Sequence, residues 1–377
     1  MKIYADNAAT TKLDIDAFEA MKPYLLEDYA NPSSAYGFSK KAKRALKEAR
    51  QTIAECINAE PEQIIFTSGG TESNNHAIKH FTVKSDIYHV VTSAIEHHSV
   101  LNACENSGYE QFILPVDKYG MVSTDELEKV LGRYRPVIAS CDSTLVTIMT
   151  ANNEIGTIQH IRELSEVSHR HGAVFHTDAV QAVGHIPIDV KTMEIDMLSA
   201  SAHKFNGPKG IGFLYSKNGL LQTFHHGGAQ EFGMRAGTEN VPAIVGMAVA
   251  LKNNVEEMMH NTEHLYHLTE VFLAALKSAD VDFMLNGHPT ERLPGNINIS
   301  FKGRSGEGLM HLLDLKDICI STGSACDSIN QQVSHVIKAI DVPAHYREGT
   351  IRVTFGKDNT EKDATDVANA LIKMIGI

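Results

Sequence analysis

Short apolar runs alternate with longer amphipathic segments through the first part of the chain. The clearest amphipathic segment covers residues 40–58, where alanines, a leucine and isoleucines recur at helical spacing after Ser39, a residue type that can cap a helix. The apolar runs are short, as expected of buried strands. They predict strands at 64–66, 90–93, 145–149, 174–177, 195–200 and 211–215, with helices at 76–81, 99–107, 125–131 and 161–171. This alternation indicates a mainly parallel sheet with helices on both faces.

The pattern changes after residue 215. Asn240 and Pro242 open a long helical region that we expect to bend between residues 253 and 261 and to end near residue 277. Beyond it, strands at 296–301, 318–321 and 350–355 mix with helices at 307–315, 332–340 and 360–375. We therefore predict an α/β fold with a large domain of residues 16–255 and a smaller α+β domain of residues 1–15 and 256–377.

Composition and charge narrow the class of protein only slightly. The 43% of hydrophobic and 21% of charged residues are an ordinary balance for a folded chain. The net charge of -12 disfavours direct binding of nucleic acid, because phosphate contacts need a basic surface. The N-terminus lacks the apolar core of a signal peptide, and no run of ~18 apolar residues suggests a membrane span, so we expect a cytoplasmic protein.

Cysteine usage points to a reducing compartment. The count is odd and no Cys-x-x-Cys pair occurs, which disfavours both a disulfide framework and a zinc cluster. The cysteines are Cys56, Cys104, Cys141, Cys319 and Cys326.

The loop after the strand predicted at 195–200 carries a candidate nucleophile, Lys204, beside His203. A lysine at the end of a buried strand is poorly solvated, and burial favours the neutral amine that can attack an aldehyde. Most lysines beside Gly-Pro turns are simply solvated, so Lys204 alone leaves both interpretations open.

Two further segments suggest a phosphate and a pyridine ring. Residues 67–71, Thr-Ser-Gly-Gly-Thr, form a strand-to-helix turn that favours an anion, although a simple capped turn would use the same residues. Asp178 follows a predicted strand at the sheet edge where ligands bind, and could pair with a pyridine nitrogen or cap a helix. Asp178 precedes Lys204 by 26 residues (204 − 178), room for a helix and a strand. Together these features predict pyridoxal 5'-phosphate.

Ordered motifs run along almost the whole chain. They are YADNAATT at 4–11, NPSS at 31–34, FTSGGTES at 66–73, EH at 96–97, NNEIG at 152–156, HTDAVQ at 176–181, HK at 203–204, GPKG at 207–210, GMRAGT at 233–238, STGSAC at 321–326 and IR at 351–352. With these motifs the chain resembles the cysteine desulfurases, class-V aminotransferase-like enzymes of pyridoxal-phosphate fold type I that supply sulfur for iron–sulfur clusters and tRNA thiolation. The resemblance implies a large domain with a mainly parallel sheet between helices, a smaller α+β domain, and a homodimer.

The resemblance also implies roles for matching residues. Lys204 would bind the cofactor covalently and later move the α-proton of the substrate, L-cysteine. Asp178 would pair with the ring nitrogen and Gln181 with the ring oxygen. His97 would stack on the ring and could shuttle protons near the substrate thiol, while Asn153 would orient ring and substrate.

The remaining implied ligands surround the phosphate and the substrate carboxylate. The phosphate ligands would be Gly70, Thr71, Ser201, His203 and, from a second subunit, Thr238. The carboxylate would be bound by Asn31 and by Arg352, whose guanidinium can act as a bidentate fork.

Cys326 is the implied nucleophile, which takes sulfur from the substrate as a persulfide and passes it to an acceptor or scaffold protein. Residues 322–333 are small and polar, which is typical of a mobile loop. A free cysteine can also serve simply as a small buried hydrophobic residue, and this is how we interpret the other four cysteines. The length of this loop is that of a subgroup that uses a scaffold protein, so Cys326 could be a transient iron–sulfur ligand. We expect no permanent metal site.

Three positions depart from the family pattern: Ala202, where Gly is common, Phe232, where Arg is common, and Asp327, where Thr is common. A carboxylate at Asp327 should raise the pKa of the adjacent thiol, so we expect a sluggish enzyme without its partner.

A selenocysteine lyase or a transaminase would share Lys204 and Asp178, but a transaminase has no use for the loop cysteine. A serine hydrolase is disfavoured because residues 303–307 lack a complete nucleophile elbow, and a non-catalytic protein with this fold would be colourless.

Overall fold

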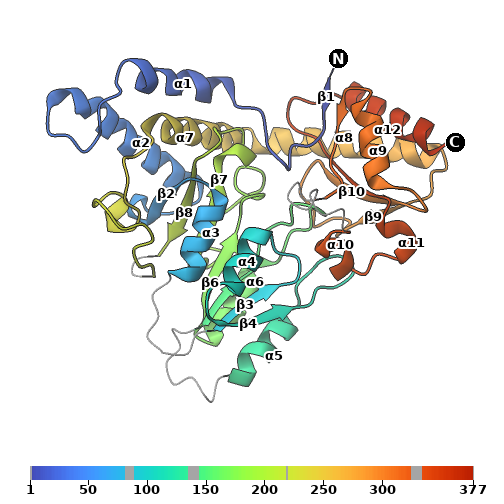
Figure 1. The fold of residues 1–377 in the computed structure, drawn as a ribbon, viewed down its shortest axis with the longest axis horizontal. Helices are drawn as coiled ribbons and strands as arrows, with labels where there is room; N and C mark the ends of the chain where they lie inside the picture. The colour runs from blue at the N-terminus through green and yellow to red at the C-terminus, as the bar shows by residue number, and fades with distance from the viewer. Residues whose placement is uncertain (1, 81–88, 135–143, 218–219, 324–332, 377) are drawn as a thin grey trace.

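The computed structural model describes residues 2–80, 89–134, 144–217, 220–323 and 333–376. Its larger unit is built on a seven-stranded sheet, with the smaller C-terminal unit beside it (Figure 1). The strand order is β2 (Ile64–Thr67), β8 (Gly212–Ser216), β7 (Met197–Ser201), β6 (Val174–Asp178), β5 (Thr144–Thr147), β3 (His89–Ser93) and β4 (Glu110–Leu114). Strand β8 is antiparallel to both neighbours and the other pairings are parallel, so the predicted mainly parallel sheet is confirmed.

Helices cover both faces of this sheet, as predicted. Alternate residues of β2 point to different cores: Ile64 and Phe66 belong to one apolar cluster and Ile65 to the other. The first cluster is shared with α2 (Lys40–Cys56), α5 (Thr124–Tyr134), α6 (Ile161–Arg170) and α7 (Val241–Glu256), and α1 (Ile15–Leu26) packs on α7. The second cluster is shared with α3 (Gly70–Lys79) and α4 (His98–Glu105).

The smaller unit has its own apolar core and its own sheets. An antiparallel sheet has the order β12 (Thr350–Thr354), β10 (Asn296–Phe301) and β9 (Phe283–Asn286), and β1 (Ile3–Tyr4) pairs in parallel with β11 (Ile318–Cys319). Its helices are α8 (Met258–Ser278), α9 (Gly306–Asp314), α10 (His335–Ala339), α11 (Ala344–Arg347) and α12 (Glu361–Ile375). The N-terminal strand thus belongs to the smaller unit, while the domain boundaries proposed above remain a prediction.

Two helix starts show where local sequence rules held and where they failed. The side chain of Asn240 accepts a hydrogen bond from the N–H of Ala243 and starts α7, and α8 begins after Glu257, at the expected bend. Ser39, in contrast, already has helical dihedral angles, because a 3₁₀ turn leads directly into α2. Its hydroxyl donates back to the carbonyls of Ser34 and Tyr36, so the predicted side-chain cap at Ser39 was wrong.

The connection between β6 and β7 also differs from the prediction. Residues 179–196 form turns and extended segments, not the helix for which the spacing leaves room. The two strands are nevertheless adjacent and parallel, with Asp178 opposite Ser199. Within the described part of the chain, no helix combines the length and apolarity that a bilayer crossing requires.

Candidate active site

A cavity of about 500 Å³ lies at the carboxyl ends of β6 and β7, where a ligand is expected in a parallel sheet. The start of α3, the start of α4, the N-terminal segment and β12 of the smaller unit complete its wall. Among the described residues, every predicted site residue lines it except two. Those that line it are Gly70, Thr71, His97, Asn153, Asp178, Gln181, Ser201, His203, Lys204 and Arg352.

Of the other three predicted site residues, two lie elsewhere and one is not described. Asn31 and Thr238 are exposed and do not line the cavity of their own chain. The side-chain oxygen of Asn31 accepts a hydrogen bond from the N–H of Ser33. Cys326, with its neighbour Asp327, lies outside the described residues.

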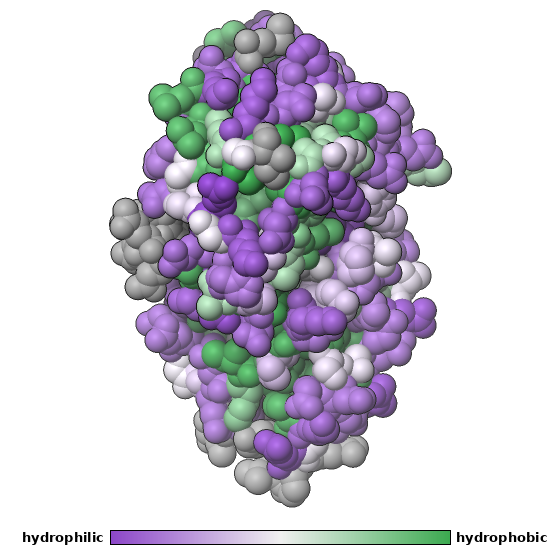
Figure 2. Space-filling model, turned by 90° about the vertical axis from the view of Figure 1, so that its right-hand side faces the viewer, coloured by the Kyte–Doolittle hydropathy of each residue, from purple (hydrophilic) through white to green (hydrophobic). Residues whose placement is uncertain are grey.

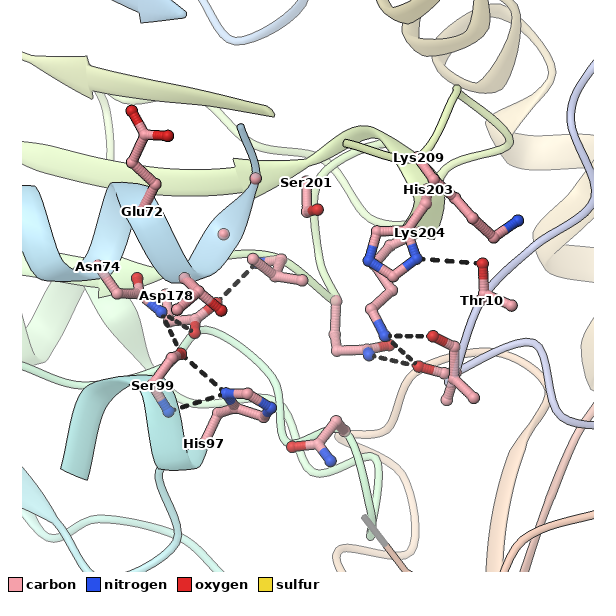
Figure 3. A pocket seen from close by; sticks show the side chains of 18 of the residues that line it. Thr10, Glu72, Asn74, His97, Ser99, Asp178, Ser201, His203, Lys204 and Lys209 are labelled. Carbon is pink, nitrogen blue, oxygen red and sulfur yellow. Dashed lines mark hydrogen bonds between the residues drawn. The ribbon is translucent and has the colours of Figure 1, made fainter. Parts of the chain in front are cut away.

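Lys204 sits in a single 3₁₀ turn, Ala202–Lys204, that follows directly on β7. Its Nζ donates to the carbonyl oxygens of Ala8 and Ala9, at 2.6 and 2.7 Å (Figure 3). Ala202, which stands where the family commonly has Gly, fits because residue 207 is a glycine. A Cβ on Gly207 would lie only 2.8 Å from the Cβ of Ala202. The turn therefore holds the lysine amine inside the cavity, facing backbone carbonyls.

Asp178 is buried, and its two carboxylate oxygens are held separately. Oδ1 accepts from the N–H of Val180 at 3.0 Å, and Oδ2 accepts from Nδ2 of Asn74 at 2.7 Å (Figure 3). No helix starts at this point, so the helix-cap alternative for Asp178 was wrong. Asn74, which the sequence analysis did not identify, is fully buried on α3.

The hydroxyl-rich turn before α3 forms the anion-binding side of the cavity. The turn leaves no room for a side chain at Gly70, since a Cβ there would lie 2.6 Å from Cγ2 of Val180. Backbone N–H groups at the start of a helix favour a phosphate. Glu72 also lies here; burial opposes its ionisation, but hydrogen bonds from Arg235 and Ser68 outweigh it and lower its pKa.

Two histidines of the cavity are held neutral by burial. Burial lowers the pKa of His203 to about 4, helped by the positive charges of Lys204 and Lys209. Burial also lowers the pKa of His97, although the negative charge of Asp178 acts in the opposite direction. Lys209 and Thr10 line the cavity as well, and neither was anticipated from the sequence.

Arg352 brings a positive charge from the smaller unit to the cavity. It is 1% exposed, its Nη2 pairs with Oδ1 of Asp6 at 2.8 Å, and its Nη1 donates to the carbonyl of Asn153 at 3.0 Å. Its Nε has no hydrogen-bond partner among the described residues. A buried guanidinium with a donor to spare suits a small carboxylate.

The cavity residues fit pyridoxal phosphate. They supply an amine at Lys204, a buried carboxylate at Asp178 for a pyridine nitrogen, and a glycine cradle at Gly70 that a methyl group would fill. The sequence motifs therefore anticipated ten residues that line the cavity, but not Asn74, which bonds to Asp178.

Comparison with known proteins agrees with this geometry. The family described as "Aminotransferase class-V" matches residues 3–367. The chain is 45% identical to a cysteine desulfurase IscS of Dictyoglomus turgidum, over 99% of this chain and 94% of the relative. Among solved structures, a NifS-like protein superposes with a TM-score of 0.89 at 33% identity, covering 100% of this chain and 99% of the other. SspA in complex with cysteine has a TM-score of 0.80 at 34% identity, covering 96% and 100%.

Proposed function

The chain belongs to the class-V aminotransferase family, and we propose that within it this protein is a pyridoxal-phosphate-dependent cysteine desulfurase. It converts L-cysteine to L-alanine and leaves the sulfur as a persulfide on Cys326. The observation that carries the proposal is the meeting of Lys204, Asp178 and Arg352 in one cavity. Its relatives named cysteine desulfurase, and the similar SspA structure with cysteine, support the substrate.

The cofactor would be held by residues that already face the cavity. The amine of Lys204 would take its aldehyde, the carboxylate of Asp178 its ring nitrogen and Gln181 its ring oxygen. The phosphate would be bound by Gly70, Thr71, Ser201 and His203. Bound pyridoxal phosphate supplies an electron-withdrawing ring that stabilises negative charge on the substrate carbon. The protein's own task is to hold the charged groups in a desolvated site and to move protons at Lys204.

The substrate carboxylate would bind to Arg352, with Asn153 beside it. Nη2 of Arg352 already pairs with the carboxylate of Asp6 at 2.8 Å, so the substrate carboxylate would compete with this internal carboxylate for the guanidinium.

Sulfur transfer is assigned to Cys326. Its thiolate would form a bond to the substrate sulfur as the carbon–sulfur bond breaks, and the electron pair of that bond would remain on the carbon that becomes alanine. The described start of this segment supports the assignment, because Ser321 pairs with Arg352 through two backbone hydrogen bonds of 3.1 and 2.6 Å. From Gly323, three residues further (326 − 323) reach Cys326, a span of at most ~11 Å.

The active form would be a homodimer. Ser33, Gln230, Phe232 and Glu239 line one surface hollow, so the segments that carry Asn31 and Thr238 lie together, outside the cavity of their own chain. Exposed large apolar side chains lie along residues 15–38, and Phe232 lies in this hollow, whereas the face on the side of the smaller unit mixes hydrophilic with hydrophobic residues (Figure 2). Those along residues 15–38 are Ile15, Phe18, Leu25, Leu26, Tyr29, Tyr36 and Phe38. A second copy would cover them and bring Thr238 to the phosphate.

The sulfur acceptor would be a scaffold or carrier protein, for iron–sulfur cluster assembly or tRNA thiolation. Cys326 could ligate a cluster transiently during transfer. Among the described residues no group of histidines, cysteines and acids is suited to a metal ion. The described cysteines Cys56, Cys104 and Cys319 are unpaired, in keeping with the reducing cytoplasm that the proposal assigns to the protein.

The test is to incubate the purified yellow protein with L-cysteine and to measure alanine and protein-bound persulfide, with and without candidate acceptors. Cys326→Ala should lose the persulfide and keep the chromophore, whereas Cys319→Ala, a free cysteine in β11, should keep both. Amino transfer to an oxo acid with no persulfide would favour a transaminase and contradict the proposal.

A further inference from the structure

A chain of hydrogen bonds joins Asp178 to His97 along one side of the cavity (Figure 3). Nδ2 of Asn74 donates to Oδ2 of Asp178 at 2.7 Å and to Oγ of Ser99 at 2.9 Å. Oγ of Ser99 lies 2.8 Å from Nδ1 of His97, and the backbone N–H of Ser99 donates to the same Nδ1 at 3.1 Å. This series of hydrogen bonds therefore connects β6 with the starts of α3 and α4.

The direction of each bond follows from the charge of Asp178. A reversed amide would set the oxygen of Asn74 against the carboxylate, so the amide must turn both of its hydrogens toward acceptors. Because Ser99 Oγ accepts one of them, its own hydrogen is available to Nδ1 of His97. Nδ1 also accepts from a backbone N–H, which can only donate, so Nδ1 carries no hydrogen. In a neutral imidazole the hydrogen is then on Nε2.

The other ring nitrogen is the one that faces the ligand. Figure 3 shows Nε2 turned away from Ser99, on the cavity side of the ring, and His97 lines the cavity. The charged and titratable groups that act on His97 are Asp178, Lys204, His98 and His335, and burial favours its neutral form. A donor N–H is therefore presented to the space between His97 and Lys204.

We propose that Asn74 and Ser99 are positioning residues that hold His97 as a neutral imidazole with its hydrogen on Nε2. His97 then donates a hydrogen bond to an acceptor atom of the bound substrate or cofactor and cannot act as a base there while it keeps that hydrogen. The amine of Lys204 remains the base for the α-proton. This inference rests on the proposed function for the identity of the substrate, but not for the state of the imidazole.

The first test reads the imidazole directly. Nitrogen-15 NMR of the histidine-labelled holoenzyme, with the His97 signals identified by their loss in His97→Gln, should show a protonated Nε2 and a bare Nδ1. In Asn74→Ala the Ser99 hydroxyl loses the partner that fixes its direction, so the His97 nitrogen signals should shift, while the backbone N–H of Ser99 still keeps Nδ1 bare. A protonated Nδ1 in the unmodified protein overturns the proposal, whether or not the protein desulfurates cysteine.

The second test is kinetic. Asn74→Ala and Ser99→Ala should each lower kcat by about tenfold with little change in KM, the effect of losing one hydrogen bond that positions a reacting group. The double variant should be no slower than either single one, because both break the same chain. Ser99→Thr, which keeps the hydroxyl, should restore the rate.

Asn75→Ala is the matched control, because within the described part of the chain the side chain of Asn75 bonds only to the carbonyl of Thr71 in its own helix. It should leave kcat and the His97 signals unchanged. The proposal is contradicted if the losses of kcat in Asn74→Ala and Ser99→Ala multiply in the double variant. It is also contradicted if Asn74→Ala behaves like Asn75→Ala. If Asn74→Ala fails to fold, Ser99→Ala and Ser99→Thr still decide it. If the protein shows the expected Nε2 hydrogen but makes no alanine from cysteine, only the proposed function is refuted, and the proposal about the imidazole stands.

Discussion

Replacing Glu96 with Gln should remove much of the dependence of stability on pH. Glu96 is fully buried beside the cavity, where Ser93 Oγ donates to Oε1 at 2.6 Å and the N–H of Met149 lies 3.0 Å from both carboxylate oxygens. Burial raises the pKa of Glu96 to about 8; these hydrogen bonds oppose the shift and the charge of Asp178 adds to it. The buried acid is therefore protonated over most of the neutral range.

The sign follows from the raised pKa in the folded state. The contribution of Glu96 to stability is complete below the unfolded pKa of 4.5 and is lost as the pH rises to about 8. Within that window, each pH unit costs about 1.4 kcal/mol, so about 2 to 3 kcal/mol should be lost between pH 6 and pH 8. Glutamine cannot ionise, so Glu96→Gln should lack this slope.

Urea unfolding of the holoenzyme at several pH values measures the difference. The unfolding free energy of Glu96→Gln minus that of the unmodified protein should increase by about 2 kcal/mol from pH 6 to pH 8. Glu105→Gln, at the exposed end of α4, should show a constant difference. A constant difference for Glu96→Gln as well would refute the assignment of a protonated buried acid.

Three further substitutions test the cofactor cradle, the substrate site and a buried ion pair. Gly70→Ala should weaken the binding of pyridoxal phosphate about tenfold, measured by equilibrium dialysis, because overpacking costs about 1–3 kcal/mol. Gly37→Ala, whose added Cβ would meet no atom within 4 Å, should leave the affinity unchanged. Equal affinities of the two variants would contradict the cradle at Gly70. Arg352→Lys should lower kcat/KM for cysteine about tenfold or more through loss of the planar fork, and unchanged kinetics would remove Arg352 from the substrate site. Arg50→Met should lower the unfolding free energy by about 3–5 kcal/mol, because it leaves the buried Glu231 without its partner at 2.7 Å. A loss below ~1 kcal/mol in urea unfolding would show that the ion pair contributes little to stability.

The elements of the fold that the sequence predicted are those with a strong local pattern. Strand β10 was predicted with the bounds observed, Asn296–Phe301, because Ile297, Ile299 and Phe301 alternate with polar residues at the spacing of a strand. Strand β4 was missed because it lies at the sheet edge, where only Leu114 is buried. Helix α1 was missed because Ala17 is its only buried residue and its large apolar side chains are exposed, so helical periodicity is weak.

The candidate site shows the same division. Residues that line the cavity, such as Lys204, Asp178 and Arg352, lie in recognisable motifs and were predicted to act together. Asp6 lies within a motif and Asn74 directly after one, but their tasks depend on which guanidinium and which strand the fold brings beside them. Such partners are separated by a hundred residues or more along the chain, so no local pattern predicts the contact.

The most direct test of the account is to identify the lysine that binds the cofactor aldehyde. The protein would be saturated with pyridoxal phosphate, reduced with borohydride, digested, and sequenced by mass spectrometry. We predict that the pyridoxyl group is found on Lys204. Labelling of Lys209, the other lysine that lines the cavity, or of no lysine in the cavity, would contradict the account.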